Sequence, residues 1–261
     1  MHTFAITEAT VTTDNGTVSY WLHQPPVDQR AATPALLLTV SSTRQASFDE
    51  DPYAIPARRF AAAGHAVVSF DLPNHGAQVN TFGEGIRGMC AAFCAGADPF
   101  VQFVKQGQAV IDACLAQGVG VGGIFACGVS RAGYCALRLA AADTRIRGVA
   151  GLAPVTDWRV LDEFAAVRHQ PAVAALALHQ YAESLAGRAV FLAIGNHDRR
   201  VGSATCLRFG LRLLELEAAI TATASTIELH LVAAAGHALG AEWRTAGADF
   251  LLRQVENTTA E

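Results

Sequence analysis

The 261-residue sequence lacks features that mark nucleic-acid-binding and membrane proteins. Only 16% of its residues are charged, the formal net charge is -4, and lysine and arginine form no run, which argues against phosphate contacts. No apolar stretch is long enough to span a bilayer. Residues 1–8 have neither the basic start nor the apolar core of a secretory signal. We therefore expect no nucleic acid and no membrane among its partners, and a cytoplasmic location.

The six cysteines show no paired spacing that is typical of metal ligands. They lie mostly in apolar segments, a pattern that favours a reducing compartment. Cys90 and Cys94 are better explained as two small apolar residues of a helix than as part of a metal site. We expect no metal ion and no cofactor.

Apolar residues are abundant, at 51% of the chain, which favours a large buried core. No change in composition marks a linker, so we expect a single domain over residues 1–261. Short apolar runs alternate with helix-like segments, which predicts a mostly parallel sheet with helices on both faces. Expected strands are 4–12, 18–23, 35–40, 66–70, 124–127, 149–152, 189–194 and 226–232, and expected helices are 53–63, 100–116, 131–142, 204–219 and 242–254. The hairpin signal Asp-Asn-Gly at 14–16 predicts an antiparallel start.

Residues 128–133, which read Gly-Val-Ser-Arg-Ala-Gly, stand between a predicted strand and a predicted helix. Small residues two positions before and after Ser130 allow the backbone to turn sharply without collision. Such a turn exposes the serine oxygen and directs the next backbone N–H to the same place. The pattern indicates a nucleophile, although by itself it also fits a glycine-rich turn with an incidental serine.

A second glycine-rich stretch, residues 118–123, matches the letters of the dinucleotide-binding fingerprint. That fingerprint must follow a strand and open a helix, so that the helix N-terminus meets the pyrophosphate. Here the glycines follow a predicted helix and precede a predicted strand. We therefore expect a connection between them and no dinucleotide site.

A serine hydroxyl becomes a good nucleophile only when a base takes its proton and an acid orients that base. Asp198 and His237 each follow a later predicted strand, so they are expected at the same edge of the sheet as Ser130. The chain order serine, aspartate, histidine is the order of the α/β-hydrolase pattern. His197 lies one strand too early to be the base, and we interpret it as a loop residue.

With these residues the chain resembles the α/β-hydrolase superfamily over nearly its whole length. The tract 151–158 is similar to that of prolyl-oligopeptidase and dienelactone-hydrolase types. Residues 71–76 resemble the Asp-x-x-Gly-x-Gly turn of the superfamily, with Asn74 at the first glycine. Ala132 replaces the second glycine of the Gly-x-Ser-x-Gly elbow. Because some members place the acid after the preceding strand, Asp157 remains an alternative to Asp198.

The resemblance implies an α/β-hydrolase fold and a role for each site residue. Ser130 would attack a carbonyl carbon, His237 would act as base and then acid, and Asp198 would orient the imidazole. The Arg131 N–H and one N–H from the Ser41–Thr43 loop, with Ser42 as the chosen donor, would form the oxyanion hole. The substrate-binding residues are then expected to be Ser41, Thr43, Trp158 and His75. Ser41 and Ser42 are weaker alternatives as nucleophile, because no small-residue elbow surrounds them.

An insertion at about 155–187 is expected to form a short helical lid, which favours a small or medium acyl ester as substrate. The predicted function is carboxylic-ester hydrolysis on a small-molecule substrate. A serine peptidase for short peptides and an acyltransferase with the same triad remain alternatives. A non-catalytic binding protein of this fold fits less well, because all three candidate triad residues are present. A homodimer is compatible with the sequence.

Overall fold

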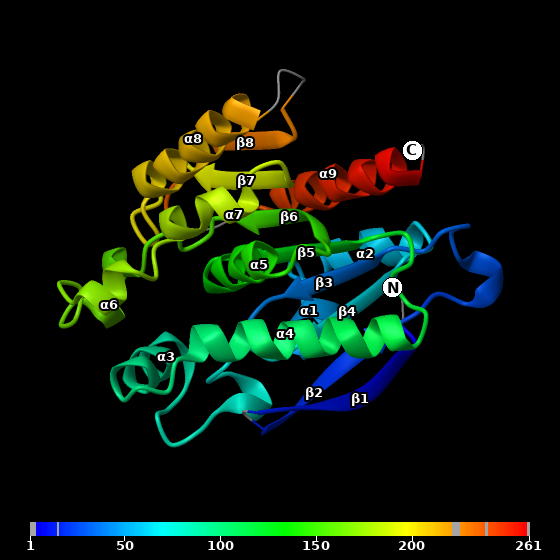
Figure 1. The fold of residues 1–261 in the computed structure, drawn as a ribbon, viewed down its shortest axis with the longest axis horizontal. Coiled ribbons are helices and arrows are strands. Elements are labelled where there is room, and N and C mark those ends of the chain that lie inside the picture. The colour runs from blue at the N-terminus through cyan, green and yellow to red at the C-terminus, as the bar shows by residue number, and fades with distance from the viewer. Residues whose placement is uncertain (1–3, 15, 221–224, 238–239, 260–261) are drawn as a thin grey trace.

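The computed structural model describes residues 4–14, 16–220, 225–237 and 240–259. Eight strands form one open sheet in the order β1-β2-β4-β3-β5-β6-β7-β8, with helices on both sides (Figure 1). The strands are β1 (Ile6–Thr13), β2 (Gly16–His23), β3 (Leu36–Val40), β4 (Ala66–Phe70), β5 (Ile124–Val129), β6 (Ile146–Leu152), β7 (Ala189–Gly195) and β8 (Ile227–Val232). Every strand expected from the sequence is present.

The sheet is antiparallel at its first edge and parallel elsewhere. β1 pairs antiparallel with β2, and β2 pairs antiparallel with β4, whereas each pair from β4 through β8 is parallel. The predicted mostly parallel sheet with an antiparallel start is confirmed, although Asn15 of the hairpin signal lies outside the described residues. Because β3, β5, β6, β7 and β8 run parallel, their carboxyl ends meet at one edge, where sites of open α/β sheets form.

Five of the longer helices fall near their predicted positions, namely α2 (Ile55–Ala62), α4 (Pro99–Ala116), α5 (Arg131–Ala142), α8 (Ser203–Ile220) and α9 (Ala241–Thr259). A further helix, α3 (Gly85–Cys94), was not among the expected helices. The glycines at 118–123 connect α4 to β5, as expected. The sequence prediction missed α1 (Arg44–Asp49), whose six residues are too few to show a helical period. Its N-terminus is capped by Thr43, whose hydroxyl accepts a hydrogen bond from the Ala46 N–H.

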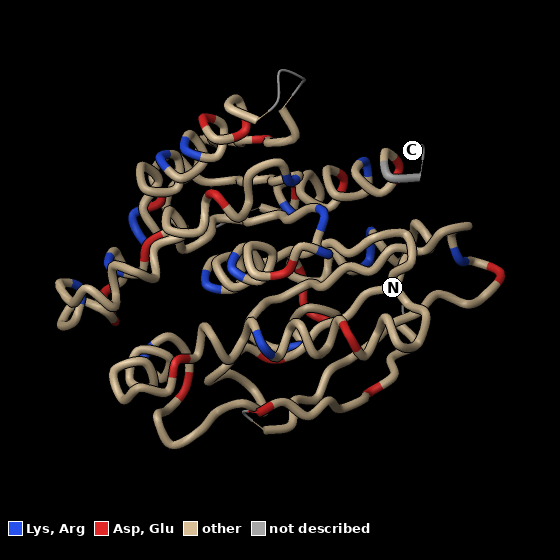
Figure 2. Tube along the Cα trace, in the orientation of Figure 1, with Lys and Arg blue, Asp and Glu red and all other residues tan. Residues whose placement is uncertain are grey.

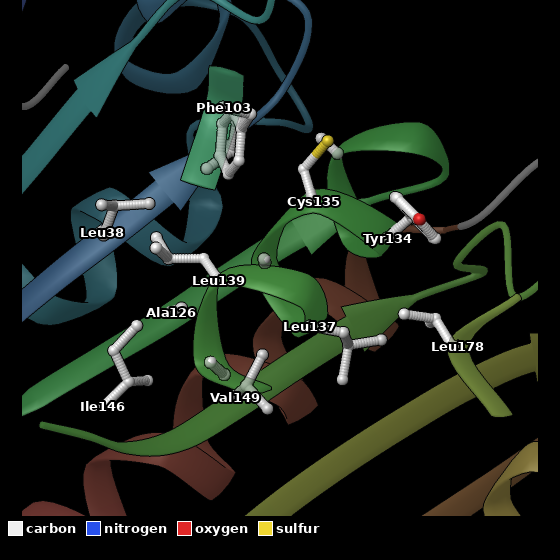
Figure 3. Close-up of a cluster of buried hydrophobic side chains, with 14 of the residues drawn as sticks. Leu38, Phe103, Ala126, Tyr134, Cys135, Leu137, Leu139, Ile146, Val149 and Leu178 are labelled. Carbon is white, nitrogen blue, oxygen red and sulfur yellow. The ribbon is translucent and has the colours of Figure 1, made fainter. Parts of the chain in front are cut away.

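Two apolar cores lie on the two faces of the sheet. Helices α4, α5 and α8 cover one face, and α2 and α9 cover the other (Figure 1). Figure 3 shows the first core, in which Leu137 and Leu139 of α5 lie against Val149 of β6 and Ala126 of β5. Helix α5, which begins at Arg131, therefore packs tightly on the centre of the sheet. This packing holds the turn before it in place.

The insertion at about 155–187 consists of short pieces rather than one or two regular helices. They are η3 (Trp158–Val160), η4 (Asp162–Phe164), α6 (Pro171–Ala174), η5 (Leu178–Tyr181) and α7 (Ala182–Leu185). The buried Tyr134 hydroxyl donates to the Leu176 carbonyl at 2.8 Å, and Arg138 donates to the same hydroxyl at 2.7 Å. The insertion is thereby anchored to α5.

Acidic and basic residues are interspersed along the trace (Figure 2). The described helices include none with the length and apolar character needed to cross a bilayer.

Candidate active site

Ser130 lies on a strained turn between β5 and α5. Its φ of 56° and ψ of -122° are rare for a residue with a side chain, and such strain concentrates at functional sites. A Cβ at Gly128 would lie 2.3 Å from the Ala132 carbonyl oxygen, so glycine is required there. Ala132 itself is accommodated with its side chain buried. The turn therefore has the geometry of a nucleophile elbow with alanine at its second small position.

The turns after β7 and β8 bring two further side chains to Ser130. His237 Nε2 lies 2.9 Å from Ser130 Oγ, and His237 Nδ1 lies 2.7 Å from Asp198 Oδ2. Because the carboxylate can only accept, Nδ1 carries the proton, and Nε2 is left to accept the Ser130 hydroxyl hydrogen. The three residues form one chain of hydrogen bonds from a buried carboxylate to an accessible hydroxyl.

Asp198 is buried and held by several hydrogen bonds. It is 2% exposed, and its second oxygen, Oδ1, accepts the N–H groups of Arg200 at 2.9 Å and Val201 at 3.1 Å. Asp157, the alternative acid, instead caps η3 and pairs with Arg159 at 2.6 Å. The structure thus brings Asp198, and not Asp157, to His237.

A pocket of about 350 Å³ opens beside Ser130. Its described lining consists of Ser41, Ser42, Pro52, Tyr53, Val129, Ser130, Arg131, His237 and Arg244. The insertion contributes none of these described lining residues. It lines, together with α8, a separate pocket of about 530 Å³ that contains Asp157. The lid expected from the sequence therefore lies beside a different cavity.

Three of the expected substrate-binding residues lie elsewhere. Trp158 has no exposed surface, and its ring packs in the core against Phe100 at 4.7 Å and Tyr134 at 5.1 Å, so we remove it from the proposed site. Thr43 caps α1 and is not among the described lining residues. His75 is buried and is not among the described lining residues, although it accepts a hydrogen bond from Arg131, which is.

In the loop after β3, the Ser42 N–H is more available to the pocket than the Ser41 N–H is. The Ser41 N–H already donates to Ser47 Oγ at 3.1 Å. Within the described residues no acceptor takes the Ser42 N–H, and Ser42 lines the pocket. The Arg131 N–H is the first of α5 and has no partner within that helix. Arg131 and Ser42 therefore both line the pocket and have backbone N–H groups without an acceptor in the described hydrogen bonds.

The Arg131 side chain is held by His75. Arg131 Nε donates to His75 Nε2 at 2.9 Å, and His75 Nδ1 lies 2.9 Å from the Pro73 carbonyl oxygen. His75 therefore accepts at one nitrogen and donates at the other, which is the neutral imidazole. Burial, and next the positive charge of Arg131, lower the pKa of His75. The turn that carries His75 depends on Asn74, whose φ of 63° is the backbone that a glycine would adopt and asparagine tolerates.

Cysteine side chains near the elbow do not compete with Ser130. Cys127 and Cys135 are buried, and burial raises the pKa of each thiol to about 12. Such thiols stay protonated at neutral pH and are poor nucleophiles. Among the described residues there is no group of three or more metal-ligating side chains.

Two lining residues, Arg244 and Tyr53, escaped the sequence prediction. Arg244 is in the first turn of α9, and Tyr53 precedes α2. Neither belongs to a motif, and they are far apart in the sequence. The one available signal was that Arg244 follows His237 closely and begins a helix at the same edge of the sheet.

The lowered pKa of His75 predicts a loss of stability in mild acid. Its pKa lies below the ordinary 6.5, so the unfolded chain binds a proton that the folded chain resists. Stability is then full above about pH 6.5 and falls as the pH drops below it. Burial shifts the pKa of His65 in the same direction. Urea unfolding gives the free energy of unfolding at pH 7.5 and at pH 5.5. The difference between these two free energies should be smaller for His75→Gln than for the original protein. The control His169→Gln, at an exposed position, should leave the difference unchanged. An equal difference in all three proteins would contradict this role for His75.

No protein-family model and no curated protein sequence matches the chain. Among solved structures, it is similar to an esterase from Pyrococcus furiosus, with a TM-score of 0.67, 16% identity and coverage of 96% of this chain and 93% of that one. A cold-adapted esterase from an Arctic intertidal metagenomic library gives a TM-score of 0.68, 16% identity and coverage of 97% and 96%. Dipeptidyl peptidase 4 of Porphyromonas gingivalis gives a TM-score of 0.67 and 18% identity, but the chain covers only 36% of that protein. These likenesses establish the α/β-hydrolase fold that the sequence predicted.

Proposed function

We propose that the protein is a serine hydrolase that cleaves carboxylic esters with small to medium acyl groups. The observation that carries this proposal is the hydrogen-bond chain Ser130–His237–Asp198, with Ser130 on a positive-φ elbow beside a pocket. Two of the similar structures are esterases, which supports the same class of chemistry. No metal or cofactor is needed for this reaction.

In the first half of the reaction, Ser130 Oγ forms a bond to the ester carbonyl carbon while its proton passes to His237 Nε2. Asp198 stabilises the imidazolium that results. The carbonyl oxygen becomes negative and accepts hydrogen bonds from the Arg131 and Ser42 N–H groups, each worth roughly 3 kcal/mol of barrier. The bond to the alcohol oxygen then breaks, and the alcohol leaves with the proton from His237.

In the second half, water attacks the acyl-enzyme. His237 takes the proton of the water and returns it to Ser130 Oγ as the carboxylic acid departs. An acyltransferase would use another alcohol or amine in place of this water. The pocket of about 350 Å³ is at the small end of ligand sites, which favours small substrates.

The second candidate is a peptidase for short peptides. The likeness to dipeptidyl peptidase 4 favours a peptidase, since the whole of this chain aligns to one part of that enzyme. Because peptidase and esterase use the same triad, only the substrate distinguishes them.

A labelling experiment tests the proposed class. A fluorophosphonate reacts with activated serines, so mass spectrometry should find its adduct on Ser130 and on no other serine. A series of p-nitrophenyl esters of increasing acyl length, assayed beside a dipeptide amide, then separates esterase from peptidase. We expect the short esters to be cleaved faster than the amide. Labelling at Ser41 or Ser42, or at no serine, would overturn the proposal.

A further inference from the structure

The loop Ser41–Thr43, whose Ser42 N–H is a proposed oxyanion donor, is joined to α1 by one buried hydroxyl group. Ser47 of α1 has no exposed surface, and its Oγ accepts the Ser41 N–H at 3.1 Å. The same hydroxyl donates to the Thr43 carbonyl oxygen at 3.2 Å. Ser47 therefore bridges the residue before Ser42 and the residue after it.

The Ser41 hydroxyl belongs to the same small network. Its Oγ donates to the Thr43 carbonyl oxygen at 3.0 Å and lies 3.2 Å from Ser47 Oγ. The Thr43 carbonyl also accepts the Ser47 N–H at 3.2 Å. A carbonyl oxygen has two lone pairs, so it can accept several such bonds. These contacts hold residues 41 and 43 at a fixed separation, with Ser42 between them.

The chain from Ser42 onward is fixed to the turn after β4. The Ser42 carbonyl oxygen accepts the Leu72 N–H at 3.2 Å, and the Arg44 N–H donates to Asp71 Oδ1 at 2.8 Å. Among the described residues, however, no acceptor takes the Ser42 N–H, and Ser42 lines the pocket beside Ser130. The loop is thus held on both sides of an N–H group that is available to a bound molecule.

On the basis of the proposed esterase function, we propose that Ser47 is a positioning residue for the oxyanion hole. Without its hydroxyl, the Ser41 N–H would be buried with no acceptor, which is costly enough for the loop to shift toward another partner or toward water. A displacement of about 1 Å at a group that contacts the reacting atoms can cost about a hundredfold in rate. Ser47 itself touches no substrate and acts through the Ser42 N–H.

The first test is steady-state hydrolysis of p-nitrophenyl acetate by Ser47→Ala. Outright loss of one oxyanion donor lowers kcat by about 100- to 1000-fold, and a displaced donor should cost less, so we expect a fall of about 10- to 100-fold. Acylation and deacylation both pass through an oxyanion, so kcat falls whichever step is slower. The oxyanion forms only in the transition state, so KM should stay within about threefold of its original value.

Ser69→Ala is the matched control. Ser69 of β4 also has no exposed surface, but its Oγ has no hydrogen-bond partner among the described residues, so its loss should leave kcat unchanged. Ser47→Cys keeps a side chain of similar size with a weaker hydrogen-bonding group, and its kcat should lie between those of Ser47→Ala and the original protein. A kcat in Ser47→Ala close to that of the original protein, or an equal fall in Ser69→Ala, would overturn the assignment.

Two further measurements separate a positioning role from a general loss of packing. A boronic acid forms a tetrahedral adduct with an activated serine and imitates the transition state, so Ser47→Ala should weaken its binding by a factor comparable to the loss in kcat. The pH at which kcat/KM falls on acidification reports on His237 and should not change. Unchanged binding of the boronic acid, or a shifted pH profile, would contradict an action through the oxyanion hole.

Amide hydrogen exchange tests the same contact without catalysis. The bond to Ser47 should protect the Ser41 N–H in the original protein, and in Ser47→Ala this group should exchange at least about tenfold faster. Ser69→Ala should leave the exchange rate as it is. Equal rates in all three proteins would overturn the inference. Thermal melting checks that each variant folds, and if Ser47→Ala does not fold, Ser47→Cys takes its place in every comparison.

Failure of this inference differs from failure of the proposed function. If the original protein cleaves esters through Ser130 and Ser47→Ala does so equally well, the positioning role is wrong and the esterase proposal stands. If no ester is cleaved and Ser130 is not labelled, the esterase proposal is wrong, and the assignment of Ser47 to an oxyanion hole is overturned with it. In that case the exchange rates still decide whether Ser47 holds the loop.

Discussion

Replacing Ser130 by alanine is expected to lower kcat for ester hydrolysis by about a millionfold, the usual cost of losing a triad serine. The methyl group cannot form the acyl bond, and His237 then has no hydroxyl to deprotonate. What remains is the contribution of the oxyanion donors and of substrate binding. Steady-state hydrolysis of a p-nitrophenyl ester, with product measured over hours, covers the necessary range.

The structure suggests that Ser130→Ala folds normally. Alanine has the same Cβ as serine, so the strain at φ 56° is unchanged, and the lost hydrogen bond to His237 is partly exposed. Ser19→Ala on β2, outside the pocket, is the matched control and should retain full activity. Activity above a few per cent in Ser130→Ala would remove Ser130 from the role of nucleophile.

Replacing Asp198 by asparagine is expected to cost on the order of ten-thousandfold in kcat. Aspartate and asparagine side chains have nearly identical shapes, but an amide nitrogen at the position of Oδ2 would donate toward His237 Nδ1. The imidazole would then carry its proton on Nε2 and could not accept the proton of Ser130. The loss of the negative charge also removes the stabilisation of the imidazolium. Rates measured across pH 6 to 9 test whether the deficit persists at every pH, as expected for a proton held on the wrong nitrogen.

Asp157→Asn is the control for that change. Asp157 pairs with Arg159 and lines the other pocket, so its substitution should alter kcat by only a small factor. A larger effect from Asp157→Asn than from Asp198→Asn would transfer the acid role to Asp157. Melting curves of both variants separate a loss of activity from a loss of folding.

Patterns of local sequence were sufficient to predict the sheet. The runs that became β3 and β4 are apolar at nearly every position because both faces of those strands are covered, and glycines at the ends of segments marked the turns. The insertion at 155–187 was harder to predict. Its short pieces have no sustained period, and they are held by contacts such as Tyr134 with Leu176, which are distant in the sequence.

Individual side chains around the site also differ from what the local sequence predicted. Trp158 was expected at the site because it ends the family-like tract 151–158, yet three aromatic rings from different segments pack against it in the core. Arg244 joins the pocket because α9 begins at the edge where β8 ends, and no local pattern announces that position. The direction in which a side chain points and the residues that it contacts depend on how the helices and strands pack. The spacing of residues along the sequence does not show this packing.

The sequence by itself determined the order of the strands and of most long helices, the elbow at Ser130, and the positions of Asp198 and His237 after later strands. Those features follow from local sterics and from hydrophobic patterning, which act within a few residues. Tertiary structure alone decided that Asp198 rather than Asp157 meets His237, that Ser42 rather than Ser41 has the open N–H, and that two arginines share the pocket. These choices depend on distances between segments that only the packed sheet and helices bring together.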